Sequence, residues 1–320
     1  MRNVRTFILL AILISGGCAK PPDAAENSNA AVAPPTISPA VDGRAAKLAE
    51  LKKKIAPFFE LMGPPRKNDW LASFKEPGQT FEEYTAGNPT LPTAARRTIY
   101  IQPAGDFTPL EKRVLDLTAE YMRVFYGLPV KMNAPLSLAK VPPAMRRKNP
   151  LEGHEQIKAG YFLDDVLPKL LPADAAAFIC LTNVDLYPDE NWNFVFGQAN
   201  LETRVGVWSM KRFGRPEKSA EDYMMFLGRT LKVAMHETGH MFSMQHCTKY
   251  VCLMSGSNNL PETDRQPLDV CPECMAKIAW GLDYPPAKRY RALAAFWKKL
   301  GWRDEEKTSL AKAAAVESAQ

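Results

Sequence analysis

The chain has 320 residues, which is enough for one large domain or two small ones with a substantial core. Hydrophobic residues make up 46% and charged residues 24%, values that are ordinary for a soluble globular protein. The formal net charge of +6 is mild, and no dense basic tract is interleaved with aromatic residues. Composition therefore gives little support for nucleic-acid binding.

The first 17 residues have the pattern of an export signal. Arg2 and Arg5 supply positive charge, and residues 7–14 form an apolar stretch that is too short to span a bilayer as a helix. Small residues precede Cys18 as in a bacterial lipobox, although Ser15 stands where a large aliphatic residue is usual. We expect export to the cell envelope, periplasmic or at the cell surface, with a lipid on Cys18 as the membrane anchor. An ordinary secretory signal is the alternative.

The two ends of the chain frame one predicted domain. Residues 18–43 are rich in Ala, Pro, Asn and Ser, a composition that cannot bury a core and that predicts a semi-extended tether after the lipidated cysteine. Residues 44–303 are predicted to form the globular domain. Residues 304–320 are charged and alanine-rich, and we predict a disordered tail there, with a frayed helix as the alternative. Nothing in the sequence indicates an oligomeric state.

Between these ends, the predicted helices and strands alternate. In chain order they are a helix at 45–61, a strand at 98–102, a helix at 108–125, a strand at 129–132, a helix at 159–171, strands at 177–182, 194–199 and 204–210, and a helix at 223–241. The proline-rich residues 133–153 are predicted to be a loop. This order indicates an α/β fold.

Three of the four histidines lie within eleven residues of one another at the end of the last predicted helix. His236 and His240 are four residues apart, so they share one helix face and could bind one zinc ion. Glu237 lies beside the first ligand, where a general base for a zinc-bound water is needed. His246 can reach the same ion only if the chain leaves the helix after His240 and folds back.

Four cysteines follow the third histidine: Cys247, Cys252, Cys271 and Cys274. They suit a closed tetrathiolate zinc site, because one turn of a C-x2-C pair supplies two ligands. Two disulfides are the alternative, since an exported chain meets an oxidising compartment. Because Cys247 directly follows His246, a structural zinc should also fix the direction of the third histidine. The sequence thus predicts two zinc ions per chain.

The combined motif, HExxHxxxxxHC-x4-C-x-M-x16-C-x2-C, resembles that of the archaemetzincin family of metzincin zinc metallopeptidases. Segments at 69–71, 78–81, 183–188 and 193–199 are also similar to family segments, so the resemblance covers roughly residues 50–300. It implies an α/β (α+β metzincin-like) fold, with a twisted mixed sheet over a long active-site helix and a C-terminal subdomain that holds the second zinc. It also implies that Met254 is the Met-turn residue beneath the histidines, and that strand 194–199 is the edge that pairs with an extended peptide substrate.

The function that follows is zinc-dependent hydrolysis of peptide bonds in a peptide or protein substrate, with Glu237 as general base. One position departs from the family pattern. Ser243 replaces the glycine that suits a left-handed turn, at a cost on the order of 1 kcal/mol. The alternative is therefore a zinc-binding lipoprotein that keeps the fold without turnover. No residue distinguishes endopeptidase from aminopeptidase activity or indicates a side-chain preference.

Three further residues are predicted to have no catalytic role. Cys180 lies in an apolar strand and is predicted to be a buried core thiol. His154 lies in a predicted loop and is expected to be solvent-exposed. Asp185 is expected to serve a turn or a polar contact.

Overall fold

The computed structural model describes residues 7–12, 39–200 and 203–318. The predicted lipidation site at Cys18 and most of the predicted tether lie outside these ranges. The first helix, α1 (Pro39–Ile55), begins inside the region predicted to be tether and continues into the 3-10 turn η1 (Ala56–Phe58). None of the helices in the described ranges combines the length and the apolar character needed to cross a membrane.

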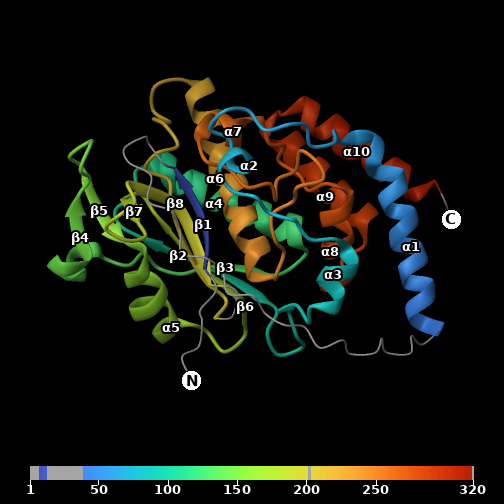
Figure 1. The fold of residues 1–320 in the computed structure, drawn as a ribbon, viewed down its shortest axis with the longest axis horizontal. Coiled ribbons are helices and arrows are strands. Elements are labelled where there is room, and N and C mark those ends of the chain that lie inside the picture. Colours follow the sequence, from blue (N-terminus) through green and yellow to red (C-terminus); the bar gives the residue numbers. More distant parts are fainter. Residues whose placement is uncertain (1–6, 13–38, 201–202, 319–320) are drawn as a thin grey trace.

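A mixed sheet forms the centre of the molecule (Figure 1). Its strands are β1 (Phe7–Ile12), β2 (Thr98–Ala104), β3 (Val130–Met132), β4 (Arg146–Lys148), β5 (Glu155–Lys158), β6 (Ala175–Thr182), β7 (Asp185–Tyr187), β8 (Phe194–Asn200) and β9 (Val205–Ser209). They are arranged β3-β2-β6-β9-β8-β7-β5-β4, and β1 pairs with β8. Strands β3, β2, β6 and β9 are parallel, whereas β8 runs antiparallel to β9. The predicted mixed sheet is confirmed.

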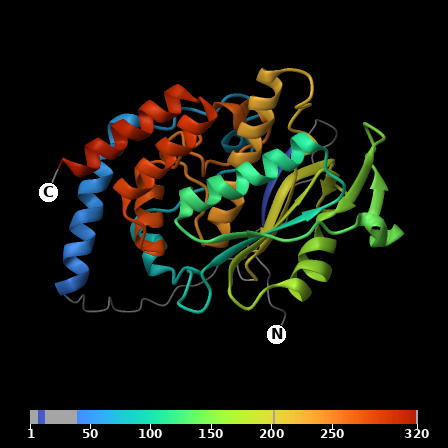
Figure 2. The ribbon, with the colours of Figure 1, turned by 180° about the vertical axis from the view of Figure 1, so that it is seen from behind.

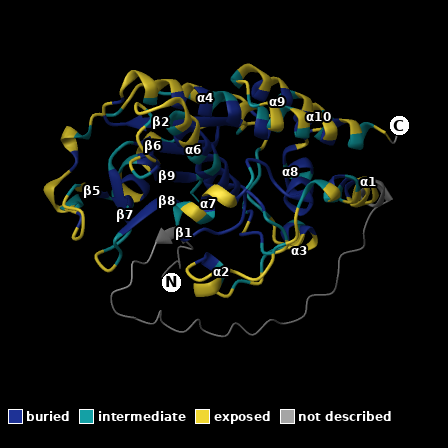
Figure 3. Cartoon of the chain, turned by 90° about the horizontal axis from the view of Figure 1, so that it is seen from above, coloured by how far each residue is buried: buried dark blue, intermediate teal, exposed yellow. Residues whose placement is uncertain are grey.

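Both faces of the central strands are covered. In β6, Ala177, Ile179 and Leu181 belong to the larger apolar cluster, whereas Phe178 and Cys180 belong to a smaller cluster on the opposite face. Because alternate residues of a strand face opposite sides, this division shows apolar packing above and below the sheet. Burial on both sides explains why these strands read as continuous apolar runs (Figure 3).

The helices divide between these two layers (Figures 1 and 2). The larger cluster contains residues of α4 (Pro109–Tyr126), α6 (Ala220–Met241), α8 (Pro272–Leu282) and α9 (Pro286–Leu300). The smaller cluster contains residues of the π-helical turn η4 (Tyr161–Val166) and of α5 (Leu167–Leu170). The remaining elements are α2 (Trp70–Ser73), α3 (Phe81–Ala86), η2 (Leu138–Lys140), η3 (Pro143–Met145), α7 (Leu260–Arg265) and α10 (Arg303–Glu317).

Besides β1, which lies inside the predicted export signal, three short strands occur where none was predicted. β4 lies inside the predicted loop 133–153, and β5 and β7 are four and three residues long. Such segments carry too few residues for a period of two to be visible. The predicted helix at 159–171 is split between η4 and α5.

The prediction of a disordered tail is wrong for residues 304–317, where the alternative of a helix holds but the helix is packed and not frayed. Residues 303–317 form α10, which packs against α9 and buries Ala313. The Lys312 ammonium is buried and donates to Asp269 Oδ2 at 2.8 Å, and the Arg289 guanidinium donates to Asp269 Oδ1 at 2.8 Å. Although burial raises the pKa of Asp269, these two cations lower it to about 2. This charged, alanine-rich segment is therefore ordered, because Lys312 is buried in an ion pair with the carboxylate of Asp269.

Candidate metal centre

Helix α6 carries the first two histidines and Glu237. Its first turn is capped by Ser219, whose side chain accepts a hydrogen bond from the backbone N–H of Asp222. His236, Glu237 and His240 all lie in its buried last turns. The helix packs beneath β8 and β9, and a Cβ at Gly197 of β8 would lie 3.3 Å from Cγ of Glu237. A glycine therefore allows the sheet to come close to the predicted general base.

A β-bulge in β8 aligns this glycine. Phe194, Phe196 and Ala199 all belong to the cluster beneath the sheet, whereas Val195 faces the other side. If side chains simply alternated along the strand, Ala199 would face the same side of the sheet as Val195. Because it faces the opposite side, one extra residue must be inserted between them. Correspondingly, the pairing with β1 passes from Gly197 to Val195 and skips Phe196. The bulge therefore turns Gly197 toward Glu237 while both phenylalanines remain in the core.

The chain leaves α6 directly after Met241 and folds back, as predicted. Ser243 has a φ of +62°, and the backbone N–H of Met244 donates to Gly239 O at 3.0 Å. Ser243 thus adopts the left-handed conformation that glycine usually supplies. Its hydroxyl oxygen accepts a hydrogen bond from the backbone N–H of Thr90 at 2.9 Å, so a neighbouring segment holds the turn.

The turn brings His246 to the other two histidines. Nδ1 of His236 lies 2.9 Å from Leu253 O, and Nδ1 of His240 lies 2.6 Å from Met244 O. Because a carbonyl oxygen only accepts, each of these Nδ1 atoms carries the proton and leaves the Nε2 lone pair free. The ligand atoms of the three histidines lie within 4.8 Å of one another, and His236 Nε2 is 2.9 Å from His240 Nε2.

The electrostatics of this cluster favour a cation. Burial, together with the charge of His246, lowers the pKa of His236 to about 3. Burial raises the pKa of Glu237 to about 8. Among the described residues, no group hydrogen-bonds to either carboxylate oxygen of Glu237 or to Nε2 of His246, although all three atoms are buried. Three neutral imidazoles with converging lone pairs are a donor set that suits zinc.

The four cysteines form a second buried cluster, and their sulfur atoms lie within 4.8 Å of one another. Four sulfurs tetrahedral about zinc at ~2.3 Å would be roughly 3.8 Å apart, so the spacing fits that ion. Cys247 Sγ lies 3.5 Å from Cys271 Sγ, and no disulfide joins the described cysteines. Hydrogen bonds from Cys252, Cys271 and Cys274 lower the pKa of Cys247.

The two clusters share one stretch of chain. Cys247 follows His246, and its backbone N–H donates to Met254 O at 2.8 Å. Met254 is fully buried, and a Cβ at Gly239 of α6 would lie 2.6 Å from its sulfur. Only a glycine between the two helical histidines therefore lets Met254 pack there. The sequence analysis did not single out Gly239.

Residues 69–90, here called the strap, cross the loop that carries His246. They include α2 and α3, and a capping box of Thr80 and Glu83 begins α3. Glu76 Oε2 lies 2.8 Å from His246 Nδ1, and the Trp70 ring meets the His246 ring edge-on with centroids 5.1 Å apart. Glu76 was not predicted from the sequence. Its one signal was the similarity of residues 78–81, two positions later, to a family segment.

Cys180, Asp185 and His154 lie apart from the histidine and cysteine clusters. Cys180 is a buried core thiol as predicted, and burial raises its pKa. Asp185 makes polar contacts as expected: it is fully buried, its Oδ1 accepts from Arg212 Nε at 2.8 Å, and its Oδ2 accepts from Arg212 at 2.7 Å. The expectation that His154 is solvent-exposed is wrong, because His154 Nε2 lies 2.8 Å from Asp185 and only a quarter of its side chain is exposed.

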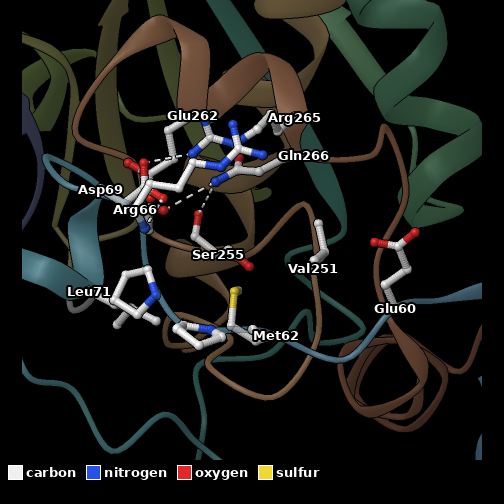
Figure 4. Close-up of a pocket in the computed structure, with 14 residues that line it drawn as sticks. Glu60, Met62, Arg66, Asp69, Leu71, Val251, Ser255, Glu262, Arg265 and Gln266 are labelled. Atoms are coloured by element: carbon white, nitrogen blue, oxygen red, sulfur yellow. Dashed lines mark hydrogen bonds and ion pairs between the residues drawn. The ribbon is translucent and has the colours of Figure 1, made fainter.

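A pocket of about 250 Å³ lies behind the strap (Figure 4). Two of its lining residues, Asp69 and Arg265, form an ion pair at 2.6 Å, and Gln266 donates to Ser255 O at 2.9 Å. Glu262 accepts from the backbone N–H of Trp70 at 3.0 Å. The ion pair and these hydrogen bonds connect the strap, α7 and the loop after Met254.

Comparisons with known proteins show the family to which this chain belongs. The sequence model of Peptidase family M54 matches residues 98–280, more than half of the chain. Archaemetzincin-2 of Homo sapiens is 34% identical over 291 residues, covering 80% of this chain and 78% of that protein, and archaemetzincin-1 of Homo sapiens is 29% identical over 259 residues, covering 70% and 51%. A crystal structure of archaemetzincin from Methanopyrus kandleri is 27% identical, with a TM-score of 0.48 over 60% of this chain and 99% of that one. The chain therefore belongs to peptidase family M54, the archaemetzincins, and is a zinc metallopeptidase.

Proposed function

We propose that this protein binds two zinc ions per chain and hydrolyses peptide bonds with Glu237 as the general base. One observation carries the proposal: three histidine nitrogens converge, and Glu237, the residue after the first of these histidines, has a buried carboxylate for which the described residues provide no hydrogen-bond partner. An unpaired buried carboxylate destabilises the fold, so its retention beside a metal site favours a chemical role. Zinc held there would polarise a carbonyl and acidify a water molecule.

The three histidines would hold the catalytic zinc, and the four cysteines would hold the structural zinc. Three neutral nitrogen ligands leave one position of a tetrahedral ion open, whereas four thiolates close the shell. The two sites are thus suited to different tasks. Met254 would support the histidine site by packing against Gly239, without acting as a ligand.

Glu237 would take a proton from the attacking water and pass it to the leaving amine. Its pKa of about 8 follows from burial alone. A nearby cation favours the carboxylate form, so a filled histidine site would lower this pKa and prepare Glu237 to accept a proton. Because β8 presents Gly197 to Glu237, a substrate backbone on β8 would lie close to this carboxylate.

Strand β8 would bind an extended peptide. β9 and β7 share one edge of β8, and β1 lies antiparallel on the other, from Phe7 opposite Asn200 to Ile12 opposite Phe194. The pairing with β1 supports the proposal, since a strand already lies antiparallel on this edge. Cleavage of residues 1–17 as an export signal would remove β1 and free the edge.

The experiment is a peptide-library digest by the wild-type protein and by Glu237→Ala, each with its zinc content measured. We expect cleavage by the wild type and a loss of about 10²–10⁴-fold in kcat/KM for the variant, with zinc content unchanged. If the wild type shows no cleavage that this substitution abolishes, the protein is the non-catalytic zinc-binding alternative. The support that Thr90 gives to Ser243 argues against that alternative.

We further propose that the chain is exported and anchored to a membrane through a lipid on Cys18. The support is the sequence of residues 1–18 alone. Mass spectrometry of the protein purified from its native membrane would test this, together with a Cys18→Ser variant. A mature chain that keeps residues 1–17, or a variant that fractionates as the wild type does, would contradict the anchor.

A further inference from the structure

The third histidine is held differently from the other two. His236 and His240 each donate from Nδ1 to a backbone carbonyl of a nearby turn. His246 instead pairs through Nδ1 with the Glu76 carboxylate at 2.8 Å, from a residue 170 positions earlier in the chain. A backbone carbonyl can be supplied by any sequence, whereas this partner depends on one side chain.

The strap contacts the His246 loop just after Glu76. A Cβ at Gly78 would lie 2.3 Å from Thr248 Oγ1, and the φ of +76° at Gly78 also favours glycine. Gln79 accepts from the backbone N–H of Gln245 at 3.1 Å and donates to Ser243 O at 3.3 Å. The backbone around Glu76 is therefore positioned by the same loop that presents His246.

The surroundings keep His246 dry, whereas Glu76 stays partly exposed. The side chain of Glu76 is 29% exposed and that of His246 only 4%. With Nδ1–H directed at a carboxylate, Nε2 of His246 must face the other two histidines.

We propose that Glu76 is the positioning residue for the third zinc ligand: its carboxylate fixes the tautomer and ring orientation of His246 and thereby sets the zinc affinity of the histidine site. The inference rests on the proposed function only in naming zinc as the ion of that site. An anionic partner also makes the imidazole more basic, so the charge and the hydrogen bond both contribute.

The test measures the zinc dissociation constant of the histidine site by competition with a chelator, in the full chain with the cysteine site filled. We expect Glu76→Ala to weaken binding by about 10- to 100-fold. Glu76→Gln keeps an oxygen acceptor without the charge, so its affinity should fall between those of Glu76→Ala and the wild type. The control is Glu82→Gln on the same strap, whose carboxylate is 3.6 Å from Lys52 and makes no described contact with His246. It should bind zinc as the wild type does.

Cobalt substitution separates this effect from misfolding. Thiolate-to-cobalt absorption reports the cysteine site alone, and it should be the same in every variant that folds. Wild-type affinity in Glu76→Ala, or in Glu76→Gln if only that variant folds, overturns the inference. Because the readout is binding, a protein without peptidase activity whose Glu76 variants lose zinc would refute the proposed function and leave the inference intact.

Discussion

The histidine and cysteine clusters are neighbours with opposite designs. The cysteine cluster has four ligands from two turns, and the sulfurs of Cys247 and Cys271 are already 3.5 Å apart. The histidine cluster offers three candidate ligands, the third of which contacts the strap, and Glu237 has a carboxylate without a hydrogen-bond partner among the described residues. A closed ligand shell suits a structural role, and an incomplete one suits reactivity. The difference indicates that the cysteine site is the scaffold on which the more weakly organised histidine site is built.

The strongest test of this comparison is Cys247→Ser. The substitution removes one thiolate, and zinc at such sites contributes directly to folding free energy. Because residue 247 follows His246, we expect the histidine site to lose about tenfold or more in zinc affinity as well. Mass spectrometry and activity would measure both effects. If zinc content fell from two to one while full activity remained, the two sites would be independent.

Lys312→Ala tests the scaffold from the other end of the chain. It leaves Asp269, two residues before Cys271, with Arg289 as its remaining buried cation, and we expect a loss of about 3 kcal/mol in the free energy of unfolding. Chemical denaturation would measure it. The matched control is Lys307→Ala, which removes an exposed lysine of the same helix and should change stability by less than about 0.5 kcal/mol. Equal losses in the two variants would show that the buried charge is not responsible.

Gly239→Ala tests the contact between α6 and Met254. The added methyl group would lie 2.6 Å from the methionine sulfur, so we expect a loss of about 1–3 kcal/mol and weaker zinc binding at the histidine site. Gly228→Ala is the control on the same helix, where the nearest atom would be 3.6 Å away. That variant should be stable or slightly stabilised, because alanine favours helices. A Gly239→Ala protein with wild-type stability and zinc affinity would exclude a supporting role for Met254.

The smallest effect concerns Ser243. Ser243→Ala keeps the left-handed conformation and loses the hydrogen bond from Thr90, so we expect it to cost about 1 kcal/mol. Ser243→Gly relieves the backbone strain and loses the same bond, and these terms nearly cancel. Thermal unfolding of the wild type and of both variants would rank their stabilities. A Ser243→Ala protein as stable as the wild type would mean that the hydroxyl does not compensate for the turn.

The sequence predicted those parts of the molecule whose determinants are local. The spacing of His236 and His240, the return of His246 and the grouping of the four cysteines all follow from a few residues of helix or turn. The role of Glu76 was not predictable, because it depends on a contact between segments 170 residues apart. Helix α10 was missed for a similar reason: Lys312 looks like a surface residue until Asp269 is known to face it. Contacts between distant charged residues leave no periodic pattern.

The strap also has a consequence for how the chain reaches its active form. Helix α6 and the C-x2-C turn rest on contacts that are short in sequence, so they can form early. The pair of Glu76 and His246 and the hydrogen bond from Thr90 to Ser243 both need two remote segments of the chain to meet. Until the strap docks, His246 would lack its carboxylate partner, so the histidine site would bind zinc more weakly than in the finished fold. The strap would thus make full zinc affinity depend on completed folding.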